Sequence, residues 1–146
     1  MMPIWFKDHT LEELMELNKN TLTTHIGIQL TEVGEDFLKG IMPVDHRTKQ
    51  PMGIVHGGAS VTLAETLGSI AANMIVNRAE KVCVGLEINA NHVRSASSGI
   101  ITGVAKPLHL GASTQVWSIE MFNDQDQLTC VSRITMAVLD RKKFKR

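Results

Sequence analysis

Residues 59–77 read ASVTLAETLGSIAANMIVN, a stretch of good helix formers without proline in which apolar residues fall on nearly every side. A helix that is apolar all round is normally buried. At a rise of 1.5 Å per residue, this stretch would span roughly 28 Å, enough to cross a small sheet. The sequence therefore predicts one long buried helix, from about Ala59 to Asn77, at the centre of the molecule.

The segments on either side of this stretch have the pattern of β-strands. Apolar, partly alternating runs at 28–33 and 37–44 flank Gly34-Glu35-Asp36, a composition that predicts a hairpin. Four more β-like segments follow the helix, at 81–94, 99–107, 113–123 and 128–140. Their short connections predict antiparallel neighbours. We expect an α+β fold, a long central helix wrapped by a six-stranded antiparallel sheet.

The two ends of the chain complete the predicted domain. Thr10 and Glu13 have the spacing of a capping box, and apolar residues follow at helical spacing, so a short amphipathic helix is expected from about Thr10 to Lys19. Five of the six residues at 141–146 are basic, and we expect a frayed, solvated tail there. Because no linker or repeat interrupts the pattern, residues 1–140 are expected to form a single domain.

Composition narrows the class of protein. The 146 residues include 15 Lys plus Arg and 15 Asp plus Glu, so the overall charge favours neither a nucleic-acid nor a membrane partner. No run approaches the ~20 apolar residues of a membrane span. Cys83 and Cys130 lie in apolar runs and are expected to be reduced core thiols. A cytoplasmic protein that acts on a small metabolite is the expectation.

The predicted loop at 45–58 carries residues suited to chemistry. It ends in QPMGIVHGG at 50–58 and leads into the long helix, whose first N–H groups have no partner inside the helix. Because Gly57 and Gly58 have no side chain, a carbonyl oxygen could lie against these amides as in an oxyanion hole. A simple tight turn would also explain the glycine pair. Gln50 and His56 flank the glycines and could donate to the same oxygen or position a water.

Glu65 is the only charged residue within 59–77. Burying a carboxylate is costly unless it is paired, protonated or faces a cavity. Such a group is usually kept for chemistry or for a salt bridge. Ser69 follows one turn later on the same face, where its hydroxyl could align the carboxylate or a water, or bond the backbone. A wet helix edge, or an arginine from a neighbouring strand or chain, would also explain Glu65.

Other site chemistries find little support in the sequence. The histidines outside the 50–58 loop are scattered without the HxxxH or HExxH spacing of a metal site, so no metal is expected. The chain also lacks the GxSxG, P-loop and GxGxxG signatures of serine hydrolases, nucleotidases and dinucleotide enzymes. With four Phe, two Trp and no Tyr, a base-stacking surface is hard to build.

The central segment resembles a known family. Residues 47–69 (RTKQPMGIVHGGASVTLAETLGS), 84–92 (VGLEINANH) and 107–111 (PLHLG) resemble the hotdog-fold acyl-CoA thioesterases of the phenylacetate-degradation-thioesterase-like group. Within that group the pattern is most similar to the enterobactin-synthesis proofreading thioesterase and 1,4-dihydroxy-2-naphthoyl-CoA hydrolase. The resemblance implies hydrolysis of acyl-CoA or aryl carrier-protein thioesters, with a lean towards aromatic acyl groups. CoA would be part of the substrate, so no cofactor is expected.

The resemblance also implies roles for individual residues. Glu65 would be the nucleophile or general base, and the Gly57 amide would polarise the thioester carbonyl. Gln50 and His56 would lie beside that carbonyl, and Ser69 beside the carboxylate. Four further residues would contact the substrate: Met52, Gly58, Asn91 and His92.

Enzymes that this chain resembles pair two chains through their sheets, often as a dimer of dimers. The resemblance therefore implies a homodimer at least, and a homotetramer, with Gln50, His56 and Gly57 facing the partner's Glu65. Three positions depart from close relatives, which often have His, Pro and Arg there: Asn91, Ser95 and Ala112. A non-catalytic acyl-CoA-binding module is the alternative function, because the same pocket can bind an ester without reacting.

Overall fold

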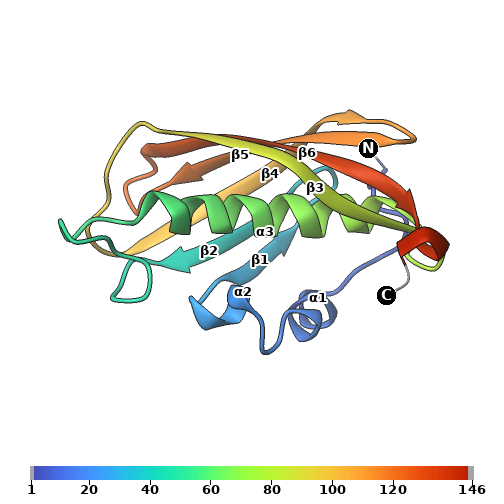
Figure 1. The fold of residues 1–146 in the computed structure, drawn as a ribbon. Helices are drawn as coiled ribbons and strands as arrows, with labels where there is room; N and C mark the ends of the chain where they lie inside the picture. The colour runs from blue at the N-terminus through green and yellow to red at the C-terminus, as the bar shows by residue number, and fades with distance from the viewer. Residues whose placement is uncertain (1, 145–146) are drawn as a thin grey trace.

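The computed structural model describes residues 2–144, which form a single curled sheet around one long helix (Figure 1). The elements in chain order are α1 (Leu11–Leu17), α2 (Leu22–His25), β1 (Gln29–Val33), β2 (Leu38–Pro43), α3 (Gly57–Ile75), β3 (Lys81–His92), β4 (Ile100–Leu110), β5 (Thr114–Phe122), β6 (Leu128–Asp140) and η1 (Arg141–Phe144). The six strands are antiparallel and lie in the order β1-β2-β4-β5-β6-β3. The predicted architecture is confirmed.

The core lies between α3 and the inner face of the sheet. Alternate residues of the strands point inward, and Trp117 and Ile119 of β5 are fully buried beside Leu63 and Leu67 of α3. Gly103 in β4 allows the sheet to approach α3 closely, because a Cβ there would lie 2.7 Å from a methyl of Leu67. This close packing fixes the position of α3 against the sheet.

α3 begins two residues earlier than predicted. His56 is its N-cap, and the Nδ1 atom of His56 accepts a hydrogen bond from the Gly58 amide at 2.8 Å. Gly57 and Gly58 are the first two residues of the helix and not the end of the loop. The helix can begin here because the His56 side chain bonds an N–H that has no partner inside the helix. The helix also ends at Ile75, since Val76 adopts an extended conformation.

The prediction that α3 is buried all round is wrong. The sheet covers only part of the helix, and one stripe along α3 stays half-buried in the chain: Val61, Thr62, Glu65, Thr66, Ser69 and Ile70. The apolar pattern of the sequence did not separate these residues from the core. Glu65 therefore lies on the less covered face of α3.

The position of β3 also differs from the expectation that successive strands are neighbours. β3 pairs with β6 at the end of the sheet, while β4 pairs with β2 and β5. The connection at 93–99 crosses to the other side of the curled sheet, and Ala96 in it accepts a hydrogen bond from the Val55 amide at 2.7 Å. The physical reason is that the strand after α3 must close the sheet over the helix. One side of β3 is consequently an edge.

Asn73 of α3 binds part of that edge. Its Nδ2 donates to the Cys83 carbonyl at 3.0 Å, and its Oδ1 accepts from the Cys83 amide at 2.9 Å. Farther along β3 a bulge lies between Gly85 and Glu87. Asn73 thus holds the first half of β3 against α3, next to the stripe that carries Glu65.

The remaining predictions outside the site had mixed outcomes. The capping box is confirmed, since the Glu13 amide donates to Thr10 Oγ1 at 3.2 Å and the Thr10 amide to Glu13 Oε2 at 3.4 Å. The sequence interpretation missed α2, which is a single turn. The tail is solvated as predicted, since residues 141–144 are all exposed, but it is not frayed there: they form η1, whose Arg141 amide donates to the Glu80 carbonyl at 2.8 Å. Residues 145–146 lie outside the described residues.

Both cysteines match the prediction of buried free thiols. Cys83 and Cys130 are buried and form no disulfide. Burial raises the pKa of the Cys83 thiol to about 11, and burial also raises the pKa of Cys130. Because the thiolate is the reactive form, neither group is a nucleophile near neutral pH.

Candidate active site

A pocket of about 370 Å³ lies at the start of α3, between the loop that precedes the helix and the end of β3. We call it the α3-start pocket. Its lining residues come from four segments: Gln50, Ile54, Val55, Gly57, Ser60, His92, Val93, Arg94, Ser95 and Thr129. Three of the predicted site residues, Gln50, Gly57 and His92, therefore meet here.

The Gly57 amide is an open hydrogen-bond donor in this pocket. The Ala59 and Ser60 amides donate to the His56 carbonyl at 2.9 and 3.1 Å, and the Gly58 amide donates to the His56 side chain. No residue within 2–144 accepts a hydrogen bond from the Gly57 amide. An unpaired N–H at the positive end of a 19-residue helix favours an oxygen that carries negative charge.

Gln50 and His92 border the same amide. Gln50 Oε1 accepts a hydrogen bond from the Met52 amide, which leaves the Nε2 group of Gln50 as its free donor among the described residues. A Cβ built on Gly57 would lie 3.0 Å from His92 Nε2, so the imidazole ring lies directly beside the backbone of Gly57. Two side chains that can donate, Gln50 and His92, thus line the same pocket as the Gly57 N–H.

Glu65 lies elsewhere on α3. It follows Gly57 by eight residues, which places it about 12 Å farther along the helix axis. Its carboxylate lies over β3, because a Cβ built on Gly85 would lie 2.8 Å from Glu65 Oε1. No donor among residues 2–144 bonds the carboxylate, and Glu65 is half-buried. Within one chain, Glu65 and the Gly57 amide cannot contact the same carbonyl group.

The other predicted site residues are distributed around these two places. His56 caps α3, and the Gly58 carbonyl accepts a hydrogen bond from Thr62 Oγ1 at 2.8 Å. Met52 is 80% exposed at the tip of the loop, and Asn91 is exposed near the end of β3. Ser69 lines a second pocket, of about 280 Å³, one turn beyond Glu65. Five of the predicted site residues thus line neither pocket: Met52, His56, Gly58, Glu65 and Asn91.

Sequence reasoning missed Gly85 and the buried polar residues of the α3-start pocket. Ser60 and Thr129 are 3% exposed and line the pocket, but hydroxyl residues at such positions carry no distinctive signal. Gly85 did carry one, because a lone glycine inside a strand often marks a bulge or a close approach. Here it marks both: the bulge follows it, and the Glu65 carboxylate lies against its Cα.

Two further features of the described residues bear on the class of site. Within 2–144 no three His, Cys, Asp or Glu side chains are grouped so that they could hold a metal ion. None of the helices in that range is both long and apolar enough to cross a membrane.

Known proteins share both the sequence and the fold. The family model described as the thioesterase superfamily matches residues 52–130, more than half of the chain. The chain is 51% identical to the 1,4-dihydroxy-2-naphthoyl-CoA hydrolase of Escherichia coli, over 93% of this chain and 99% of that protein. It is 46% identical to the proofreading thioesterase EntH of Cronobacter turicensis, over 93% of this chain and 98% of that protein.

The solved structure of a thioesterase from Haemophilus influenzae superposes with a TM-score of 0.91 at 47% identity, covering 94% of this chain and 95% of that one. The matched family segment includes Glu65, the strand that carries Gly85 and every lining residue of the α3-start pocket except Gln50. Sequence, fold and site geometry agree: the chain belongs to the thioesterase superfamily, has its hotdog fold and is a thioester hydrolase.

Proposed function

We propose that the protein hydrolyses acyl-CoA thioesters to a carboxylic acid and free CoA in the cytoplasm, with Glu65 as the catalytic carboxylate. The observation that carries the proposal is the unpaired Gly57 N–H, which lines a pocket together with Gln50 and His92. Glu65 supplies the second half of the chemistry, because its carboxylate has no donor among the described residues and is free to react.

The proposed reaction uses these groups in sequence. The thioester carbonyl oxygen accepts hydrogen bonds from the Gly57 amide and the Gln50 Nε2 group, which stabilise the negative charge that develops on it. Glu65 either attacks the carbonyl carbon or takes a proton from the water that attacks it. Collapse of the tetrahedral intermediate breaks the C–S bond and expels the CoA thiolate. When water attacks, this step gives the acid directly. When Glu65 attacks, it leaves an acyl–Glu65 anhydride, which a water then hydrolyses to the acid and free Glu65. Ser69, one turn from Glu65, would orient the carboxylate or its water.

We further propose that each site is built from two chains. The Gly57 amide and Glu65 of one chain are about 12 Å apart along α3. β3 presents its edge between these two places, with Glu65 over Gly85 and Gly57 beside His92. When two β3 edges pair antiparallel so that Gly85 lies opposite the partner's His92, Glu65 faces the partner's Gly57. Exposed Leu86 on β3 supports an interface here.

The acyl group is proposed from the relatives. The E. coli protein that shares 51% of its residues is named for a naphthoyl-CoA ester, which supports CoA as the thiol and an aromatic acyl group. The direct experiment is thiol release from benzoyl, hydroxynaphthoyl, short aliphatic and long aliphatic CoA esters and an aryl carrier-protein thioester. We expect turnover, fastest for the aromatic CoA esters. Tight binding of these esters without turnover would instead support the acyl-CoA-binding alternative.

A subunit-mixing experiment tests the two-chain site. The Glu65→Gln and Gly57→Pro variants each damage a different half of the site, so each homodimer is expected to be inactive. After subunit exchange, half of the dimers are mixed and each has one intact site, so about a quarter of the wild-type activity is expected to return. Wild-type protein taken through the same exchange at the same total concentration gives the reference activity. Activity that stays at the level of the parents contradicts the two-chain site.

A further inference from the structure

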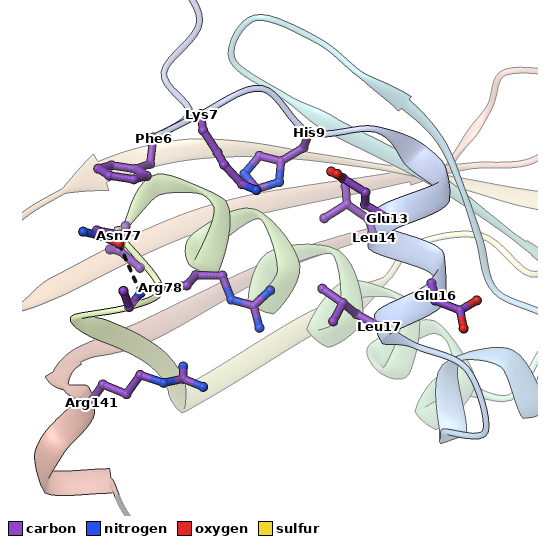
Figure 2. Close-up of a pocket in the computed structure, with 12 residues that line it drawn as sticks. Phe6, Lys7, His9, Glu13, Leu14, Glu16, Leu17, Asn77, Arg78 and Arg141 are labelled. Atoms are coloured by element: carbon purple, nitrogen blue, oxygen red, sulfur yellow. Dashed lines mark hydrogen bonds between the residues drawn. The ribbon is translucent and has the colours of Figure 1, made fainter.

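A groove leads from the Glu65 stripe to the far end of α3. Its first part is the 280 Å³ pocket, which lies between α1, α3 and the start of β3 and includes Ser69 and Ile70. Its second part, of about 740 Å³, is drawn in Figure 2 and lies between α1, the segment before it and the end of α3. Four residues line both parts and join them: His9, Leu14, Leu17 and Arg78. We call the whole the acyl groove.

The walls of the acyl groove nearest Glu65 are mainly apolar. Leu14 and Leu17 of α1 face Ile70 and Met74 of α3, and Val82 of β3 closes the side. β3 runs antiparallel to α3 here. Moving along β3 from Val82 to Gly85 therefore corresponds to moving back along α3 from Ser69 to Glu65. An acyl chain whose carbonyl lies at Glu65 can therefore extend along this stripe into the groove.

The far end of the acyl groove is positively charged. Figure 2 shows the Arg78 side chain extended along the last turns of α3 towards Leu17, with Arg141 and Lys7 on the other sides. No ion pair joins Arg78 to a carboxylate among the described residues. Burial and the nearby Lys7 and Arg78 charges lower the pKa of His9, against a smaller opposing effect of Glu13.

The two carboxylates that line the groove are already engaged. Glu13 Oε2 accepts from the Thr10 amide in the capping box, and Glu16 lies 3.5 Å from Lys19. Neither contacts Arg78. The cationic end of the groove is thus left without a charge partner among residues 2–144, and the partner it suits is an anion brought by a ligand.

We propose that the acyl groove selects thioesters whose acyl group carries a carboxylate at its far end, and that Arg78 binds that carboxylate. This inference rests on the proposed function of the Glu65 site. Arg78 follows the end of α3 and lines the groove together with Asn73 and Met74, which lie about 12 to 14 Å along α3 from Glu65. Among aliphatic thioesters, the class that this groove favours is therefore an ω-carboxyacyl ester long enough to cover that distance, roughly an extended ten-carbon chain.

The test compares decanedioyl-CoA with decanoyl-CoA, which differ only in the distal carboxylate. We expect the wild type to prefer decanedioyl-CoA, and Arg78→Gln to lower kcat/KM for this ester about tenfold through KM. The kcat/KM of Arg78→Gln for decanoyl-CoA should stay within about twofold of the wild-type value. Lys142→Gln is the matched control, because it removes an exposed cation of η1 that does not line the groove.

The outcomes separate this inference from the proposed function. An equal fall in kcat/KM for both esters in Arg78→Gln would mean that Arg78 contacts the CoA phosphates. An unchanged kcat/KM for both would mean that Arg78 does not contact the substrate. Either result overturns the inference, while hydrolysis itself stands. If neither ester is hydrolysed, the same comparison is made by calorimetry, which measures the affinity of decanedioic and decanoic acids for the wild type and for Arg78→Gln. Equal affinity of the wild type for the two acids would then overturn it.

Discussion

Replacing Glu65 by glutamine is expected to lower kcat by at least about 10³-fold, because an amide neither attacks a thioester carbonyl nor takes a proton from water. The change keeps the size of the side chain. It also removes no hydrogen bond among the described residues, so the fold should be retained. The measurement is kcat for the best CoA ester, together with the thermal unfolding midpoint, which should shift by no more than a few degrees.

The control for this variant is Glu120→Gln, which removes the same charge from an exposed position on the outer face of β5. It should keep wild-type kcat. A Glu65→Gln rate within tenfold of the wild type would overturn the assignment of Glu65. A single turnover in heavy-oxygen water then separates the two possible roles, since only a covalent intermediate on Glu65 allows the label to enter the protein carboxylate.

Replacing Gly57 by proline is expected to lower kcat about 10² to 10³-fold relative to Gly57→Ala, the usual effect of removing one oxyanion donor. Proline removes the N–H itself. It is tolerated at the first position of a helix, where the amide has no helical partner, and His56 already has the extended backbone that a residue before proline prefers. The Gly57 amide has no acceptor among the described residues, so no hydrogen bond of the fold is lost.

Gly57→Ala is the matched control because alanine keeps the N–H and adds only a Cβ. That Cβ would lie 3.0 Å from His92 Nε2, so the alanine variant measures the effect of crowding the pocket. The ratio of the two kcat values then reports the N–H alone. Equal kcat values for the proline and alanine variants, with unfolding midpoints close to the wild type, would show that the Gly57 amide does not stabilise the transition state.

The long helix and the strands could be predicted because their signals are local. The capping box at Thr10, the turn after Val33 and the apolar pattern from Ala59 each depend on a few neighbouring residues, and the structure confirms the elements they predict. The place of β3 could not be predicted in this way. Its pairing with β6 depends on how the whole sheet closes over α3, which no local spacing encodes.

The site shows the same division. The two glycines at the start of the helix and the lone carboxylate on it were visible as candidates in the sequence, and the structure places Gln50, Gly57 and His92 around one pocket. The contact of Glu65 with Gly85 could not be predicted, because it joins two elements whose relative position is set by tertiary packing. The uniformly apolar pattern of α3 also hid its half-buried stripe, since the pattern records residue type and not what covers each side.

The position of Asn73 has a consequence for how two chains would align in the proposed dimer. Both backbone hydrogen-bonding groups of Cys83 are occupied by this side chain, so a strand that adds to β3 finds no ladder partners there. In the proposed dimer, sliding of one strand along the other towards the start of β3 is therefore obstructed. The open edge that remains begins at Gly85, directly under Glu65. In the proposed dimer Asn73, which touches no reacting atom, would thereby act as a stop that keeps the two half-sites facing each other.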